Sequence, residues 1–407
     1  MPTSLRAPVT TAAAVRSGTK RRRRFLQLEL LDNRFPALHG MRVLAIVSVV
    51  QFHVTWVFAG EQAIPLDRDF VRSSLALFFG MDLFFFLSGF LIGSILLHTL
   101  STSGIRGLWR FYLRRIFRTF PAYWVVLTLL VLLFPLSPDQ RQHLLFEYIY
   151  ATNLMPLHRD QVVMFWGWSL ALEEQFYLLV PFLFYGLRAL RKDRYRIALL
   201  AALCGLALAH RLYLFFNQGP WTDYTLYDRL YFRPDTRFDA LLYGIILAII
   251  EFRHAEAVAR WLKDPFHRAL LLVPSLGILW VLLEPTLFGI EYLQLVRVFA
   301  WGTLPSLMYL AWVPLLLHSD GALQRWLGRG YFRYIGTLGY GVYLLHIPIL
   351  DHLVVPAARA LQQGGVSMLA VWPLSLTVLM IGSLAAAYVL HLLVEKPALW
   401  LRARVAG

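Results

Sequence analysis

The sequence predicts an all-α, polytopic membrane protein with about ten transmembrane helices in one bundle. Hydrophobic residues make up 58% of the 407 positions and charged residues only 15%, with a mean hydropathy of +0.57. A soluble domain has about a quarter of its residues charged, so this composition excludes that class. The apolar residues gather into runs long enough to cross a bilayer. These runs lie at about 38–59, 73–98, 119–136, 165–187, 197–214, 237–251, 269–284, 295–317, 335–355 and 368–394.

The first run carries Arg42 and His53 with ten residues between them. Ionisable groups inside a membrane are costly unless they are paired or hydrated, so both are functional candidates. Their spacing is about three helical turns, which brings both side chains to one helix face at levels ~16 Å apart. A neutral histidine can take a proton from an alcohol and return it, so His53 is a candidate general base for acyl transfer to a hydroxyl. The alternative is a histidine that is hydrogen-bonded in the bundle core.

The second run is longer than a bilayer requires and carries glycines together with Asp82 and Ser88, so we expect it to be tilted or broken. A basic motif from Arg110 to Arg118 precedes the third run. Arg115 and Arg118 are three positions apart on a helix and can present two guanidinium groups to one phosphate, as a nucleotide-bearing donor requires. The same motif is also typical of a simple topology signal.

The fourth run opens with Trp166 and Trp168, which we expect in the aromatic belt at the membrane interface. Ser169, Glu173 and Tyr177 follow at intervals of four residues and therefore share one helix face. A carboxylate on this face could orient His53 or bind hydroxyl groups of an acceptor sugar. Glu173 is the candidate for that role.

The later runs carry fewer polar groups. Arg237 and Asp239 open the sixth run, Tyr343 and His346 lie in the ninth, and Glu395-Lys-Pro ends the tenth. These groups fit two interpretations, a functional site or ion pairs that hold the bundle together. The single Cys204 lies in an apolar run and is interpreted as a core residue.

Arginine and lysine residues are distributed unequally between the loops. If the N-terminus is cytoplasmic, the inside segments hold about three times as many basic residues as the outside segments. We therefore expect both termini in the cytoplasm, and we attribute the net charge of +15 to topology and contact with anionic lipid rather than to nucleic-acid binding. Three regions follow: a basic, disordered cytoplasmic tail at 1–33, the membrane domain at 34–401 and a short tail at 402–407.

Seven motifs in this order resemble the membrane-bound acyltransferase family 3, over about 34–401. They are Arg42 with His53, MDLFFFLSGFLIGS from Met81, RRIFRTFPAYW from Arg114, WSLALEEQFYLLVP from Trp168, RPDTRFDALLYG from Arg233, LGYGVYLLHIP from Leu338 and VEKPA from Val394. The resemblance implies a ten-helix enzyme of the bacterial inner membrane. It would carry an acyl group, most often acetyl from cytoplasmic acetyl-CoA, to a hydroxyl of a sugar, glycan or glycolipid.

The resemblance also implies roles for residues. His53 would be the catalytic base, supported by Glu173 and Asp82, and Arg42, Arg115 and Arg118 would bind the donor. The acceptor side would include Ser169, Tyr177, Arg237, Asp239, Tyr343 and His346. No permanently bound cofactor and no metal are expected. The chain departs from the family at Lys396, where members commonly have arginine, which puts a binding role for that charge in doubt.

Several alternatives stay open at this level. The chain shows no fused periplasmic SGNH-type hydrolase domain, so it would complete the transfer itself or hand it to a separate periplasmic partner. Direct transfer and an acyl-enzyme on Ser169 or His53 are both compatible with the residues. A secondary transporter would show related halves and paired interrupted helices, neither of which is present in the sequence pattern. A non-catalytic scaffold would not need the arginine and histidine positions in the family's register.

Overall fold

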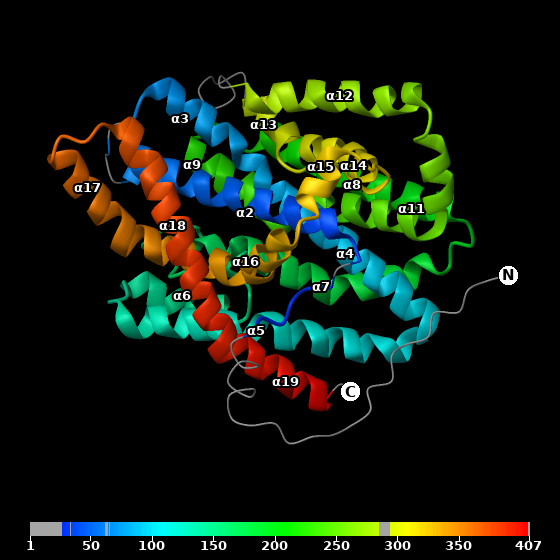
Figure 1. Ribbon diagram of the computed structural model, residues 1–407, viewed down its shortest axis with the longest axis horizontal. Coiled ribbons are helices and arrows are strands. Elements are labelled where there is room, and N and C mark those ends of the chain that lie inside the picture. Colours follow the sequence, from blue (N-terminus) through cyan, green and yellow to red (C-terminus); the bar gives the residue numbers. More distant parts are fainter. Residues whose placement is uncertain (1–26, 33, 62–63, 65, 285–293, 406–407) are drawn as a thin grey trace.

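The computed structural model describes residues 27–32, 34–61, 64, 66–284 and 294–405. Throughout these residues the chain forms helices joined by turns and contains no strand, which confirms the predicted all-α class (Figure 1). The helices of the first half are α2 (Pro36–Trp56), η1 (Val57–Glu61), α3 (Arg68–Leu75), η2 (Ala76–Phe79), α4 (Gly80–Thr102), η3 (Gly104–Arg106), α5 (Gly107–Leu133), α6 (Pro138–Tyr148), η4 (Thr152–Leu154), η5 (Phe165–Gly167), α7 (Trp168–Leu187) and α8 (Asp193–Asn217).

The second half continues the same pattern of long helices and short helical turns. Its elements are α9 (Asp223–Leu226), η6 (Tyr227–Tyr231), α10 (Pro234–Arg237), α11 (Asp239–Trp261), α12 (Pro265–Leu283), α13 (Gln294–Ala300), α14 (Thr303–Leu317), α15 (Ala322–Leu327), α16 (Gly330–Ile349), η9 (Leu350–Val354), α17 (Val355–Gln363), α18 (Met368–Leu390), η10 (His391–Glu395) and α19 (Lys396–Val405). α19 therefore extends into the predicted tail that begins at residue 402.

Each of the ten predicted runs overlaps a helix, and eight helical stretches of the described chain are long and apolar enough to cross a membrane. These eight are Pro36–Gly60, Asp69–Thr102, Gly104–Leu133, Phe165–Leu187, Asp193–Asn217, Pro265–Leu283, Gly330–Gln363 and Met368–Val405. The two runs outside this set lie in α11, whose second half is rich in charged residues, and in α14, which has only 15 residues. A helix needs about 20 residues to span the hydrocarbon core, and α11 and α14 fall outside the set for these reasons of charge and length.

The helix with Arg42 and His53 is central. α2 packs against α4, α16 and α18, and Figure 1 shows it passing through the middle of the molecule. α2 is α-helical from Pro36 to Trp56 without a proline after its first turn, so the two side chains keep the spacing of a regular helix. The predicted separation of ~16 Å along the axis follows from that geometry.

The closest packing in the bundle is between α4 and α11. A Cβ atom at Gly89 would collide with the carbonyl oxygen of Leu241, and one at Gly244 would collide with the carbonyl oxygen of Phe86. Small residues allow membrane helices to approach backbone to backbone, where van der Waals contact replaces the hydrophobic effect. The glycine-rich second run, expected to be tilted or broken, is a 3₁₀ turn (η2) followed by a regular helix (α4), and Gly89 lies at the crossing.

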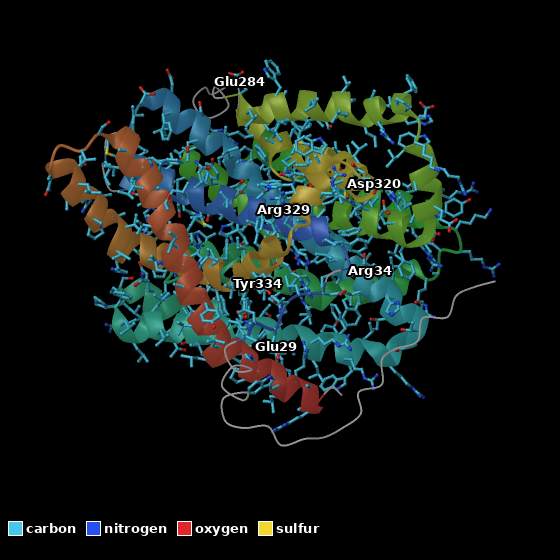
Figure 2. The ribbon with its side chains drawn as sticks, viewed as in Figure 1. Glu29, Arg34, Glu284, Asp320, Arg329 and Tyr334 are labelled. Carbon is cyan, nitrogen blue, oxygen red and sulfur yellow. The ribbon has the colours of Figure 1, made fainter. Side chains whose placement is uncertain are left out.

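Residues 27–32 of the predicted tail are bonded to the bundle. The Leu31 amide donates to the Thr337 hydroxyl at 3.3 Å, and the carboxylate of Glu29, which is labelled in Figure 2, accepts from the Trp400 indole at 3.2 Å. The Lys396 ammonium donates to the Gln27 carbonyl at 2.5 Å. Lys396, the position that departs from the family, thus helps to hold this segment against α19. The prediction for residues 1–26 lies outside the described residues.

Candidate active site

His53 contacts a second histidine. The Nε2 atom of His346 lies 3.2 Å from Nδ1 of His53, and the two ring centroids are 5.0 Å apart. His53 Nδ1 also lies 2.9 Å from the Val49 carbonyl oxygen, and His346 Nδ1 lies 2.6 Å from the Tyr343 carbonyl oxygen. The sequence prediction placed His346 in substrate binding; the structure places it directly behind the ring of His53.

These contacts define the tautomer of each histidine. A carbonyl oxygen can only accept, so Nδ1 of each ring must carry the hydrogen. His346 Nε2 is then a bare acceptor that faces the Nδ1–H of His53. It follows that Nε2 of His53 carries no hydrogen when the ring is neutral, which is the form that a general base requires.

His53 lines a cavity of about 420 Å³ at the end of α2. Nine of the seventeen lining residues are Phe, Tyr or Trp, and none of the seventeen is Asp or Glu. The volume is within the range of small-molecule sites, which are largely apolar with a few oriented polar groups. The structure therefore places His53 where a small polar ligand with an apolar face can reach it.

The aromatic wall next to His53 also carries an arginine. The rings of Trp56 and Phe165 each lie 6.4 Å from the His53 ring, and the guanidinium carbon of Arg159 lies 4.8 Å from the centroid of Phe165. Arg159 donates to Asp351 at 2.5 Å, and 30% of its side chain is exposed. A second arginine, Arg297 of α13, lines the cavity as well. Sequence analysis assigned no role to either: Arg159 lies in a loop without a motif, and Arg297 is a single arginine within the apolar run 295–317.

The two tryptophans of the fourth run are buried, so the prediction that they form an interfacial belt is wrong. Trp168 lines the cavity and packs against Phe232, and the carbonyl of Trp166 accepts from the Tyr343 hydroxyl at 2.8 Å. The Tyr343 hydroxyl lies 2.5 Å from that of Ser169. Ser169 and Tyr343 therefore form a hydrogen-bonded pair behind the wall and do not line the cavity.

A second polar cluster lies further along the bundle. The Tyr177 hydroxyl is 2.5 Å from that of Ser88, and the guanidinium carbon of Arg115 lies 3.7 Å from the centre of the Tyr177 ring. Glu173 is buried, and its Oε1 has no hydrogen-bond partner among the described residues. We call Arg42, Arg115, Arg118, Glu173 and Tyr177 the arginine cluster.

The members of the arginine cluster are close enough for their charges to act on one another. The charges of Arg118, Arg115 and Glu173 act on Arg42, and Glu395 and Arg402 act on Arg118. The cluster thus joins α2, α5 and α7 to η10 and α19. The spacing of Arg115 and Arg118 makes them neighbours on α5, and the tertiary fold brings Arg42 of α2 near enough for its charge to interact with theirs.

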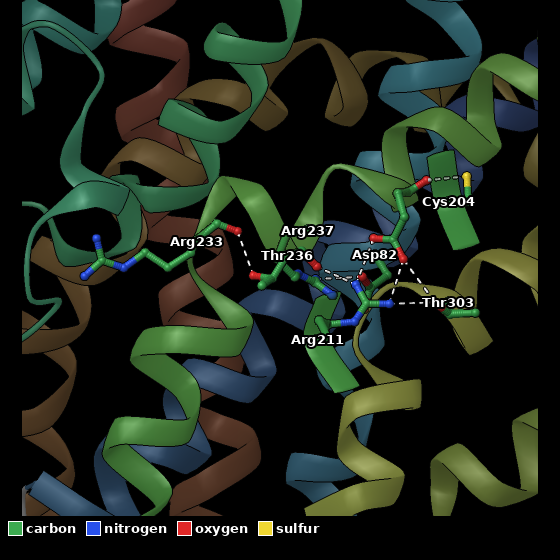
Figure 3. Close-up of polar contacts among 8 residues, drawn as sticks. Asp82, Cys204, Arg211, Arg233, Thr236, Arg237 and Thr303 are labelled. Carbon is green, nitrogen blue, oxygen red and sulfur yellow. Dashed lines mark hydrogen bonds and ion pairs between the residues drawn. The ribbon is translucent and has the colours of Figure 1, made fainter. Parts of the chain in front are cut away.

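Asp82, Arg237 and Asp239 are in a third group that is fully buried. Asp82 pairs with Arg237 at 2.7 Å, and Asp239 pairs with Arg211 at 2.8 Å (Figure 3). Arg211 also donates to the carbonyl of Thr236 and to the Thr303 hydroxyl. Arg211 was not among the sequence candidates, although an arginine within an apolar run is by itself a signal.

These ion pairs lie one layer behind the cavity. None of the four side chains lines it, but the guanidinium carbon of Arg237 lies 4.5 Å from the ring centre of Tyr231, which does. The catalytic role predicted for Asp82 and the substrate-binding roles predicted for Arg237 and Asp239 stay predictions. The Asp82–Arg237 pair packs behind the cavity wall through the contact of Arg237 with Tyr231.

The segment before the fourth run is held by a buried carboxylate. Glu147, in α6 outside the spanning helices, accepts from the amides of Val163 at 2.8 Å and Met164 at 2.7 Å. Burial raises the pKa of Glu147 to about 7, and the two amide donors lower it in part. This bond positions the segment that carries Arg159 and Phe165 to the cavity.

Fold and site together define a polytopic membrane protein with a histidine at an aromatic cavity and, near the other end of the same central helix, the arginine cluster. The chain belongs to the acyltransferase family 3 that its motifs resemble, since the model of this family, described as an acyltransferase domain, matches residues 35–392. No solved structure matches the fold.

Bacterial relatives carry names of one enzyme class. The peptidoglycan O-acetyltransferase OatA of Listeria monocytogenes is 28% identical over 356 residues, which cover 80% of this chain and 51% of OatA. "Putative O-acetyltransferase SACOL0978" of Staphylococcus aureus is 26% identical, over 78% of this chain and 50% of its own length. "Putative peptidoglycan O-acetyltransferase YrhL" of Bacillus subtilis is 28% identical, over 77% and 48%. The chain spans about half the length of the curated relatives it matches.

Proposed function

We propose that this chain transfers an acyl group, acetyl by preference, from acyl-CoA to a hydroxyl of a sugar or glycan, with His53 as the general base. The observation that carries the proposal is the position of His53: it lines the aromatic cavity, and its contacts with Val49 and His346 leave Nε2 as the proton acceptor. Family membership supports acyl transfer, and the relatives' names support a glycan acceptor.

The proton and the acyl group move in a balanced sequence. Nε2 of His53 takes the proton of the acceptor hydroxyl, and the resulting alkoxide attacks the thioester carbon. The tetrahedral intermediate collapses with cleavage of the carbon–sulfur bond. The imidazolium of His53 then returns its proton to the departing CoA thiolate, so the base is regenerated.

His346 acts on this sequence as a positioning residue. While His53 is an imidazolium, its Nδ1–H faces the bare Nε2 of His346 and the Val49 carbonyl, and both stabilise the positive ring. A ring held from two sides also keeps its Nε2 directed at one place in the cavity. This is how the contact between the two histidines favours direct transfer.

An acyl-enzyme on Ser169 is less favoured. Its hydroxyl is buried, bonded to Tyr343 and absent from the cavity lining, so an acyl group would have to displace this pair. We therefore assign Ser169 and Tyr343 to the support of the wall near the acceptor.

The arginine cluster is the proposed docking site of the donor. Three guanidinium groups on α2 and α5 whose charges act on one another suit the phosphates of CoA, because arginine pairs with phosphate through two parallel hydrogen bonds. An extended pantetheine arm can bridge the ~16 Å between Arg42 and His53. This arrangement fits a bacterial inner-membrane protein with both termini in the cytoplasm, the donor on the cytoplasmic side and the acceptor on the periplasmic side. A separate periplasmic partner is a second destination for the acyl group.

Labelled acetyl-CoA tests the proposal with purified protein in nanodiscs. We expect wild type to bind acetyl-CoA and release CoA in the presence of a glycan acceptor, with label in the glycan fraction. His53→Ala should keep donor binding and lose turnover by about 100-fold or more. His210→Ala, which removes a histidine paired with Asp235 away from the cavity, is the matched control and should retain activity. If folded wild type does not bind acetyl-CoA, the proposal fails, and the transporter and scaffold alternatives apply again.

A further inference from the structure

Arginine and histidine side chains line the cavity. Among the described lining residues they are Arg159, Arg297, His53 and His158, and the seventeen described lining residues include no carboxylate. Two of these residues pair with carboxylates that do not line the cavity: Arg159 pairs with Asp351, and His158 pairs with Asp160. Such a site favours an anionic ligand, because low-dielectric aromatic walls strengthen its interaction with the arginines.

Arg159 is placed to contact a ligand that also reaches His53. Its guanidinium lies over Phe165, whose ring is a neighbour of His53, and its charge acts on His53. One of its nitrogens bonds Asp351. A guanidinium has five N–H donors in a planar fork, so one arginine can bond its internal carboxylate and a ligand anion together.

The aromatic walls indicate what carries the anion. Sugar rings present C–H faces that pack against aromatic rings, whose faces are the negative side of the quadrupole. Trp56, Trp168 and Phe232 offer such rings around the cavity. A flat anion without an apolar face would leave these walls unfilled.

We propose that the acceptor is an acidic sugar, whose carboxylate or phosphate group binds Arg159 while a nearby hydroxyl reaches His53. The proposal rests on the proposed function for the statement that the cavity holds the acceptor. It extends that function because neither family membership nor the relatives' names assign a charge to the acceptor. Binding of the anion also offsets the positive charge of Arg159 at the step in which His53 becomes an imidazolium.

Equilibrium binding without CoA tests the charge preference directly. Methyl glucuronide is compared with its own methyl ester, and glucose 1-phosphate with glucose, on full-length protein in nanodiscs of zwitterionic lipid. We expect the acid to bind about tenfold more tightly than the ester, as for a charge-assisted contact, with a preference that weakens in salt. The carboxylate and phosphate arms identify which anion the site takes. Equal affinity for acid and ester, together with equal affinity for phosphate and neutral sugar, would overturn the proposal.

Variants assign the preference to Arg159. Arg159→Gln should bring the acid-to-ester ratio close to one, while Arg229→Gln, which removes an arginine paired with Asp235 outside the cavity lining, should leave it unchanged. Asp351→Asn removes the internal carboxylate and should raise the ratio. If Arg159→Gln does not fold, as judged by size-exclusion chromatography, Asp351→Asn decides: an unchanged ratio contradicts the role of Arg159.

The outcomes separate this inference from the proposed function. Acid-selective binding without any acetyl transfer would keep the anion-binding role of Arg159 and remove the proposed reaction, and with it the statement that the bound sugar is the acceptor. Transfer to neutral sugars with no acid preference would keep the reaction and remove the inference.

Discussion

The two ends of α2 hold their polar groups in opposite ways. Around His53, two histidine rings are joined by a hydrogen bond of 3.2 Å, and His53 lines a cavity with aromatic walls. Around Arg42 lie two further arginines, Arg115 and Arg118, together with Glu173 and Tyr177. Proton transfer needs a base that is not already charged, whereas phosphate binding needs fixed cations. The difference shows how one helix can serve two chemistries when about three turns separate them.

The largest effect is expected for a substitution at Asp82. It tests whether Asp82 supports the fold around the His53 end of α2 or takes part in the chemistry there. Asp82→Asn leaves Arg237 as a buried, unpaired charge, which costs about 3–5 kcal/mol in known cases. We expect a clear loss of thermal stability in detergent, and the double variant Asp82→Asn with Arg237→Gln should recover part of it. A stable Asp82→Asn protein that binds donor but does not turn over would instead support the predicted catalytic role.

The next effect distinguishes the arginine cluster from the cavity. Arg115→Gln should raise the KM for acetyl-CoA by about 10- to 100-fold with little change in kcat, since a charge-assisted hydrogen bond to phosphate is lost. Arg110→Gln on the same helix, at an exposed position, is the control. A fall in kcat at unchanged KM would assign Arg115 to the chemistry or to the fold.

The reverse pattern is expected at His346. His346→Phe should lower kcat by about tenfold and leave the KM for acetyl-CoA unchanged, because His53 loses one of the two acceptors of its Nδ1–H. His346→Gln should restore much of the rate, since an amide oxygen can accept in place of Nε2. Equal rates for the two variants would mean that the contact between the histidines is a packing contact only.

The smallest effect concerns pH. The pKa of Glu147 is about 7 in the folded protein and near its usual 4.5 when unfolded, so the folded state binds the proton more tightly. Its stabilising contribution is present below pH 4.5 and is lost as the pH rises through 7. Wild type should therefore have a lower Tm at pH 8 than at pH 5, and Glu147→Gln should show a smaller difference. The same pH dependence in both proteins would assign it to other groups.

Much of the fold could be predicted from the sequence, because apolar length reports directly on bilayer crossing. The runs and the spacing of Arg42 and His53 needed only helix geometry. The count of crossings was harder for α11, where buried apolar residues and exposed charges share one helix. The burial of Trp166 and Trp168 was missed because tryptophan composition alone does not distinguish an interfacial ring from the wall of a cavity.

Sequence reasoning could propose site residues that share one helix, whereas the contacts between residues on distant helices could not be predicted from it. Arg115 and Arg118 are neighbours by sequence spacing alone. Arg159 reaches His53 only because α6 and Glu147 hold its segment, and His346 reaches His53 only because α16 packs on α2. Such pairings depend on contacts between distant segments, which no local pattern contains.

The glycine crossing of α4 and α11 restricts where the molecule can deform. Helices in backbone contact through Gly89 and Gly244 cannot move closer, and moving apart would forfeit their packing. The part of the cavity wall formed by Phe78 and Met81, in η2 and at the start of α4, is therefore rigid. Any enlargement needed for a longer glycan would then come from other lining segments, 155–165 and 224–232, which consist of short helical turns and connecting loops. We therefore expect those two segments to determine which acceptor chain lengths the cavity accommodates.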